Sequence, residues 1–202
     1  MSTRDYLDLL STWKQKKIFR TVDFATLLGR NMSSVRVELS RLTSRGMLSR
    51  ASKGLYLNPY NLPTQEELAM LLRPPAYISM ESALARHGVL SQSPFTLTLV
   101  TAGSTGTIDA MNTRFEYHHL QSAWFVGYRR HEAYDMAEPE KALCDLVYLR
   151  YRRTRELSQD RMRSMLDDMD LAALHKVPLR RYIRLMRLED AFHQLEIAPL
   201  HE

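Results

Sequence analysis

The sequence predicts an α+β protein, in which N-terminal helices and a short hairpin precede a mixed α/β domain with a small sheet and C-terminal helices. Two observations support this class. Apolar residues recur every three to four positions in the first 45 residues and again after Glu138, as they do on one face of a helix. Between these stretches, Phe95–Thr101 alternates apolar and polar side chains, as a half-buried strand does.

The composition is typical of a globular protein, because 45% of the 202 residues are hydrophobic and 25% are charged. The sequence contains no apolar run of about 18 residues and opens with no signal-peptide pattern, so we expect a cytoplasmic protein. The single cysteine, Cys144, cannot form an internal disulfide. Its apolar surroundings, Ala142–Val147, favour a buried structural residue over a nucleophile.

The positive charge is concentrated in the first third of the chain. Residues 1–60 hold eleven Lys or Arg and four Asp or Glu, so they carry +7, whereas the net charge of the whole chain is +5. The remaining residues therefore carry −2. This distribution indicates a phosphate-binding module joined to a second domain, and a merely solvated basic face is the alternative.

The first 60 residues have the pattern of a winged helix-turn-helix. Apolar spacing predicts helices over Thr3 to Lys16, Val22 to Leu28 and Ser33 to Arg45, with Ser33 as the cap of the third. Gly29 breaks the chain between the last two helices. A basic hairpin from Met47 to Leu57 follows, in which Gly54 takes a positive φ.

The helix Ser33 to Arg45 is the candidate DNA-recognition helix. Val35, Leu39 and Leu42 fall on one buried stripe, so small and cationic side chains face away from the core. We expect Ser33 and Ser34 to meet a phosphate through free amides at the helix start, and Arg36 and Arg41 to reach base edges or the backbone. The full candidate DNA-binding set is Ser33, Ser34, Arg36, Val37, Ser40, Arg41, Arg45, Arg50 and Lys53.

The sequence predicts three segments: a winged helix-turn-helix domain over residues 1–60, a linker with a short helix over 61–76, and a C-terminal domain over 77–202. The linker helix begins with a capping box, Thr64 to Glu67, and ends at Leu72. In the C-terminal domain we expect strands at Tyr77–Ile78, Phe95–Thr101, Arg114–Leu120 and Trp124–Tyr134, and helices at Met80–His87 with Ser79 as cap, from Glu138, at Gln159–Asp167, Leu171–Lys176 and Pro178–Leu195.

The sequence shows no motif for catalysis, a cofactor or a metal ion, and we expect that the protein is not an enzyme. Gly103–Gly106 lacks the Lys-Ser/Thr of a P-loop and is better interpreted as a loop between strands. Asp135 with Glu140 resembles a nuclease pattern, but Lys141 is adjacent to Glu140 instead of two places on, which disfavours a nuclease. His118 and His119 point to opposite faces of a strand.

Two further arginine clusters occur in the C-terminal domain. Arginine-rich helix faces are usually solvated, but a second contact with nucleic acid or with an acidic partner stays open. The clusters are Arg150, Arg152, Arg153 and Arg155, and then Arg180, Arg181, Arg184 and Arg187.

The chain resembles the AbiEi family, the antitoxins of abortive-infection type IV toxin-antitoxin systems. Each motif is short, and the specificity lies in their order, which spans about residues 5 to 150. The motifs are Val35–Leu42, Gly46–Leu48, Lys53–Tyr56, Tyr77–Leu84 with His87–Gly88, and Ala137–Leu143 with Asp145–Leu146.

The resemblance implies a cytoplasmic bacterial protein that represses its own operon and counters a nucleotidyltransferase-like toxin. Family members bind inverted repeats near their promoter, so paired copies are expected on neighbouring half-sites of the operator DNA. In this interpretation Glu140 and Lys141 are structural and ion-paired. The alternative is a stand-alone winged-helix transcription factor whose C-terminal domain senses a ligand or partner.

Overall fold

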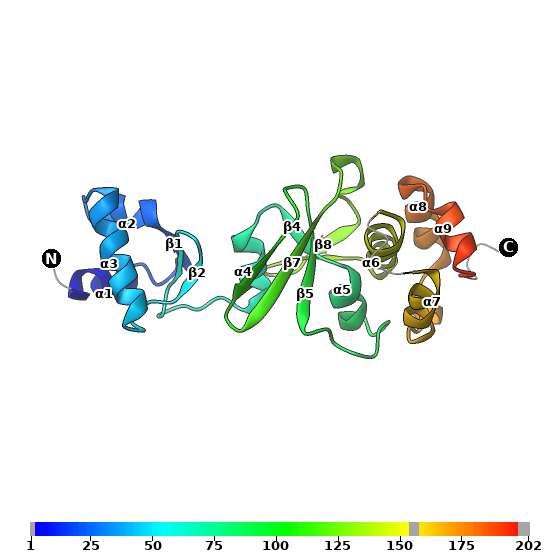
Figure 1. The fold of residues 1–202 in the computed structure, drawn as a ribbon, viewed down its shortest axis with the longest axis horizontal. Helices are drawn as coiled ribbons and strands as arrows, with labels where there is room; N and C mark the ends of the chain where they lie inside the picture. The colour runs from blue at the N-terminus through cyan, green and yellow to red at the C-terminus, as the bar shows by residue number, and fades with distance from the viewer. Residues whose placement is uncertain (1–2, 154–157, 198–202) are drawn as a thin grey trace. The chain divides into compact units, whose positions relative to one another are not determined.

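The computed structural model describes residues 3–153 and 158–197, and it confirms a mixed α+β fold (Figure 1). The described residues divide into two compact units. The first consists of the residues up to Leu72 together with Ile108–Asn112. The second consists of the other residues from Arg73 onward. Among these residues, no helix is both long enough and apolar enough to cross a membrane.

The first unit contains a small antiparallel sheet with the strand order β1-β3-β2. Strand β1 was not expected from the sequence, because three residues are too few to show an alternating pattern. The elements are α1 (Thr3–Thr12), β1 (Ile18–Arg20), α2 (Thr21–Leu27), α3 (Met32–Ser44), β2 (Arg50–Ser52), β3 (Leu55–Leu57) and α4 (Gln65–Leu72).

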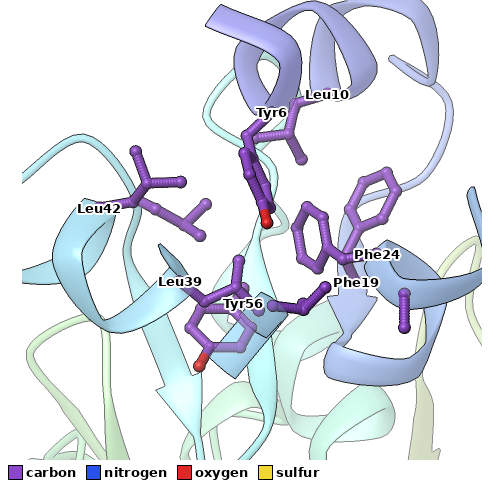
Figure 2. Close-up of a cluster of buried hydrophobic side chains, with 10 residues drawn as sticks. Tyr6, Leu10, Phe19, Phe24, Leu39, Leu42 and Tyr56 are labelled. Atoms are coloured by element: carbon purple, nitrogen blue, oxygen red, sulfur yellow. The ribbon is translucent and has the colours of Figure 1, made fainter. Parts of the chain in front are cut away.

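The core of the first unit joins its helices to this sheet (Figure 2). The ring of Phe24 lies 5.2 Å from the ring of Phe19 and 5.9 Å from the ring of Tyr6, measured between centroids. Leu39 and Leu42 of α3 are buried in the same cluster. Because these residues fix one face of α3, the opposite face is left to solvent.

Asn58, just before the linker predicted from the sequence, anchors the end of α1. This helix ends at Thr12, four residues earlier than expected. The Asn58 side-chain amide is buried and donates hydrogen bonds to the carbonyl oxygens of Leu10, Trp13 and Lys16, at 3.1, 3.1 and 3.0 Å. One side chain thereby binds a carbonyl in the last turn of the helix and two carbonyls in the segment that follows it.

The predicted capping box of α4 is confirmed. The Thr64 hydroxyl accepts a hydrogen bond of 3.2 Å from the Glu67 amide, and the Glu67 carboxylate accepts one of 2.9 Å from the Thr64 amide. Glu67 also pairs with Lys17. The hydrogen bond from Lys17, together with that from Thr64, lowers the pKa of the Glu67 carboxyl.

A mixed sheet has the strand order β6-β7-β5-β4-β9-β8, and all of it except the end of β6 belongs to the second unit. Strand β5 pairs antiparallel with β4 and parallel with β7, and helix α6 contacts α5 on one side and α8 on the other (Figure 1). The elements are β4 (Ala76–Ile78), α5 (Met80–Arg86), β5 (Thr96–Thr101), β6 (Gly106–Ala110), β7 (Thr113–His119), β8 (Tyr128–Arg130), β9 (Asp135–Ala137), α6 (Pro139–Leu146), a π-helical segment (Val147–Arg153), α7 (Gln159–Asp167), α8 (Lys176–Met186) and α9 (Glu189–Gln194).

Three expected elements of this unit are wrong. The strand Trp124–Tyr134 is instead a 3₁₀ turn, Ser122–Trp124, followed by β8. Gly127 between them has φ +77°, and an added Cβ would lie 2.6 Å from the Tyr182 hydroxyl. The single helix Pro178–Leu195 is divided into α8 and α9, because Arg187 adopts a left-handed conformation with φ 55°.

The segment Leu171–Lys176 was expected as a helix. It is instead a 3₁₀ turn, Leu171–Ala173, and α8 begins at Lys176. The Asp170 side chain caps this turn by accepting a hydrogen bond of 3.2 Å from the Ala172 amide. Strand β6 was not expected from the sequence. It joins β7 through a two-residue turn in which Met111 and Asn112 both have positive φ, and Met is not a residue that signals such a turn.

A fully buried polar cluster joins β4 to α6. Lys141 pairs with Asp145, and Tyr77 and Ser79 donate hydrogen bonds of 3.0 and 2.8 Å to the other Asp145 oxygen. Ser79 precedes α5 as expected, but its hydroxyl makes no cap hydrogen bond. Lys141 is therefore ion-paired, with Asp145 and not with Glu140, whose carboxylate accepts a bond of 2.8 Å from the His175 amide.

Candidate nucleic-acid interface

Helix α3 presents a face of short side chains to solvent. Val35, Leu39 and Leu42 are buried. At 100° per residue, the opposite face has Ser33, Val37, Ser40 and Ser44 along its centre, and all four are exposed. Arg36 and Arg41 lie on the two flanks of this face.

A groove of about 900 Å³ separates α3 from the β2–β3 hairpin. It brings together three cationic side chains from two elements: Arg36 from α3, and Arg50 and Lys53 from the hairpin. All three are exposed. The complete lining is Thr21, Arg36, Ser40, Thr43, Ser44, Arg50, Lys53, Gly54 and Tyr56.

The hairpin places its cations through local geometry. Gly54 has φ +77°, as expected, and the turn of Lys53 and Gly54 reverses the chain between β2 and β3. The Arg50 Nε donates a hydrogen bond of 3.0 Å to the Ser52 carbonyl. This bond orients the guanidinium by one nitrogen and leaves its two terminal nitrogens for a ligand.

The start of α3 differs from the expectation. Asn31, and not Ser33, is the N-cap: its side-chain oxygen accepts hydrogen bonds from the Ser34 amide at 2.9 Å and from the Ser33 hydroxyl at 2.7 Å. Asn is as good a cap as Ser because its carbonyl oxygen reaches the same amide. The Ser34 amide is thus satisfied within the protein and is not free for a phosphate.

The structure separates two arginines that the sequence pattern does not distinguish. Arg36 lines the groove with Arg50 and Lys53, whereas Arg41 does not. Arg41 instead donates a hydrogen bond of 2.8 Å to Glu38. Arg45 follows the helix as its exposed C-cap residue.

Sequence reasoning missed Thr21 and Thr43 as lining residues of the groove. Thr43 lies seven positions after Arg36, which is two helical turns, so helical spacing alone was sufficient to find it. Thr21 depends on the fold, since it precedes Gly54 of the hairpin by 33 residues. Its amide donates a hydrogen bond of 2.9 Å to the Gly54 carbonyl.

The second unit contains a separate cavity of about 410 Å³. Three histidines from different segments line it, together with Arg129, two glutamates and four apolar residues. Glu138 accepts hydrogen bonds from Tyr182 at 2.7 Å and from Arg129 at 3.0 Å, and the bond from Tyr182 is the main cause of its lowered pKa. The lining residues are His87, Arg129, His131, Met136, Ala137, Glu138, Pro139, Glu140, His175 and Pro178.

The later arginine clusters are not uniform surfaces. Arg150 is buried and pairs with Glu81 at 3.0 Å and with Glu116 at 3.3 Å. Arg181, Arg184 and Arg187 are all exposed, and Arg181 donates a hydrogen bond of 2.6 Å to the Tyr182 hydroxyl. Arg155 lies outside the described residues.

The remaining sequence motifs occupy ordinary structural positions. Gly103 lies in the loop between β5 and β6, and Asp135 pairs with Arg130 across the β8–β9 ladder at 3.4 Å. Within residues 3–153 and 158–197, no group of three His, Cys, Asp or Glu side chains is arranged to hold a metal ion. Cys144 is fully buried, as expected, and burial raises the pKa of its thiol.

No protein-family model matches the chain, and no curated protein matches it.

Proposed function

We propose that the chain is a DNA-binding transcriptional regulator and that its first unit is a winged helix-turn-helix. The observation that carries this proposal is the groove between α3 and the hairpin, which gathers Arg36, Arg50 and Lys53 around one space. Cations converging from a helix and a neighbouring hairpin suit the phosphate backbone beside a groove of duplex DNA.

The geometry supports different roles for the exposed face of α3 and for the cations of the hairpin. The face of α3 with Ser33, Val37 and Ser40 carries short side chains, so the helix can approach base edges closely in the major groove. The cations of the hairpin then contact the flanking backbone. Such phosphate contacts set the position of a protein on DNA and supply much of its affinity.

The finer part of the proposal is that the protein is the antitoxin of a type IV toxin-antitoxin system. It binds promoter inverted repeats as paired copies, represses its own operon in the cytoplasm, and counteracts a nucleotidyltransferase-like toxin. This part is supported by the ordered motifs shared with the AbiEi family, from Val35–Leu42 to Asp145–Leu146.

A titration of the upstream promoter fragment tests DNA binding. We expect Arg36→Gln with Arg50→Gln to lower affinity about tenfold or more, and to reduce the dependence of log K on log salt by about two. The matched control, Arg4→Gln with Lys14→Gln, removes the same charge from exposed positions elsewhere in the unit. Equal losses in the two double variants would show that only net charge matters and would reject this interface.

Co-expression tests the antitoxin role. The adjacent reading frame is expressed alone and together with the full-length chain. We expect growth arrest when it is expressed alone and growth when the chain is also present. If toxicity is unchanged by the chain, the antitoxin role is wrong even where DNA binding holds.

A stand-alone regulator that senses a small ligand is the second candidate. It is favoured by the cavity lined by His87, His131 and His175, whose volume of about 410 Å³ lies in the range of small-molecule sites. This candidate is supported if the promoter fragment is bound but no neighbouring reading frame is toxic.

A further inference from the structure

We propose that Val37 determines specificity by contacting the 5-methyl group of a thymine in each half-site. This inference rests on the proposed function, because it concerns how α3 distinguishes bases once it lies in the major groove.

Val37 is unusual on the surface of α3. Its side chain is 51% exposed, and it is the only large hydrophobic residue of this fully described helix that is strongly exposed. Its neighbours along the centre of the outward face, Ser33, Ser40 and Ser44, are all short. A base edge that meets this face therefore meets the Val37 methyl groups without obstruction from a longer side chain.

The longer side chains of α3 have other partners or other directions. Arg36 lines the groove shared with the hairpin, and Arg41 is hydrogen-bonded to Glu38 at 2.8 Å. These contacts direct the two arginines toward the flanks of the helix. The centre of the face is thus left to hydroxyl and methyl groups.

The chemistry of the major groove then singles out one base. Serine hydroxyls donate or accept, so they bond to any base edge and discriminate weakly. The Ser33 hydroxyl is already bonded to Asn31, and the Ser44 hydroxyl to the Arg41 carbonyl. An apolar side chain that packs against a base amino or carbonyl group displaces the water bound to that group and does not replace its hydrogen bond. The thymine methyl group makes no hydrogen bond with water, so an apolar contact costs it none.

The test begins with duplexes selected by the full-length protein from a random library. We expect a thymine at a constant position of each selected half-site. Replacing that thymine by deoxyuridine removes only the methyl group and lowers affinity about threefold to fivefold per half-site. In Val37→Ala the ratio of the two affinities falls to about one, whereas Val37→Thr, which retains one methyl, keeps part of it. Val177→Ala, an exposed valine of α8 in the other unit, keeps the full ratio.

The outcomes separate the two proposals. If no sequence is enriched, the proposed DNA-binding function fails, and this inference fails with it. If sequences are enriched but deoxyuridine has no effect at any thymine, or has the same effect in Val37→Ala, the thymine contact is wrong while DNA binding stands. Far-ultraviolet circular dichroism and a melting curve establish that each variant is folded.

Discussion

Arg41 donates a hydrogen bond of 2.8 Å to the carboxylate of Glu38, three residues earlier on α3. The Arg41 side chain is 63% exposed and that of Glu38 is 25% exposed, so the pair lies at the surface. Such pairs contribute little to folding stability, typically below about 1 kcal/mol. The larger effect of Glu38 is electrostatic, since it places a negative charge on the helix that is proposed to approach phosphates.

Glu38→Gln is therefore expected to strengthen DNA binding. The change removes repulsion from the phosphates and releases Arg41 from its ion pair, and we expect affinity to rise about threefold to tenfold at low salt, with a salt dependence steeper by about one. Fluorescence anisotropy with the promoter fragment at several salt concentrations measures both the affinity and its salt dependence. Asp8→Asn, an exposed acid on α1, is the control and has a smaller effect. Weaker binding by Glu38→Gln would mean that Glu38 itself contacts DNA or orients Arg41 productively.

Asn58→Ala is expected to destabilise the first unit by about 2 to 4 kcal/mol, because three carbonyl oxygens lose the same donor and the site is buried. Urea denaturation, monitored by Trp13 fluorescence in a Trp124→Phe background, reports on this unit. Asn61→Ala is the control, since its amide makes one exposed bond, to the Lys14 carbonyl at 2.6 Å. A loss no larger than that of the control would contradict the anchoring role of Asn58.

Helices with several turns were predictable, because apolar spacing and end signals agreed. Helix α7 has the expected bounds, and the Thr64 capping box begins α4 as the pattern indicated. The breaks in the second unit were not predictable, since their causes lie elsewhere in the chain. Gly127 bends the chain where the Tyr182 hydroxyl packs against it, and nothing near Gly127 in the sequence signals that contact.

The candidate site was predictable as a set of residues but not as an arrangement. Helical spacing alone placed Arg36 and Val37 away from the core. That Arg36 lines a groove depends on how β2 and β3 pack beside α3, whereas the pair of Arg41 with Glu38 is a local contact within one helix. The choice of Asn31 over Ser33 as cap was ambiguous, because both residue types are good N-caps.

Lys141 and Asp145 should show strong coupling in a double-mutant cycle. Lys141→Met leaves Asp145 buried beside Tyr77 and Ser79 without a cation, and we expect a loss of about 3 to 5 kcal/mol in the free energy of unfolding. Adding Asp145→Asn removes the uncompensated charge and keeps a carbonyl acceptor for the two hydroxyls. The double variant should therefore lose at least about 1 kcal/mol less than the sum of the single variants, as measured by urea denaturation. Additive losses would show that the pair is not coupled.

Protonation of the Glu116 carboxylate should make the second unit less stable at acidic pH. Its carboxylate lies 3.1 Å from His118 Nε2 and 3.3 Å from an Arg150 nitrogen. The close contact with His118 and the charge of Arg150 outweigh burial and lower the pKa of Glu116 from 4.5 to about 2. Because the folded-state pKa is the lower one, this stabilisation is present above about pH 4.5 and is lost as the pH falls toward 2.

Between pH 5 and pH 3, the free energy of unfolding of the native chain should fall by about 1 kcal/mol more than that of Glu116→Gln, after allowance for the partial exposure of the carboxylate. The other acids titrate in both proteins and cancel in the comparison. Urea denaturation at the two pH values, followed by Trp124 fluorescence in a Trp13→Phe background, measures the difference. Glu189→Gln, an exposed acid at the start of α9, should follow the native chain. Equal pH dependence in the native chain and Glu116→Gln would mean that the contacts with His118 and Arg150 do not stabilise the folded state.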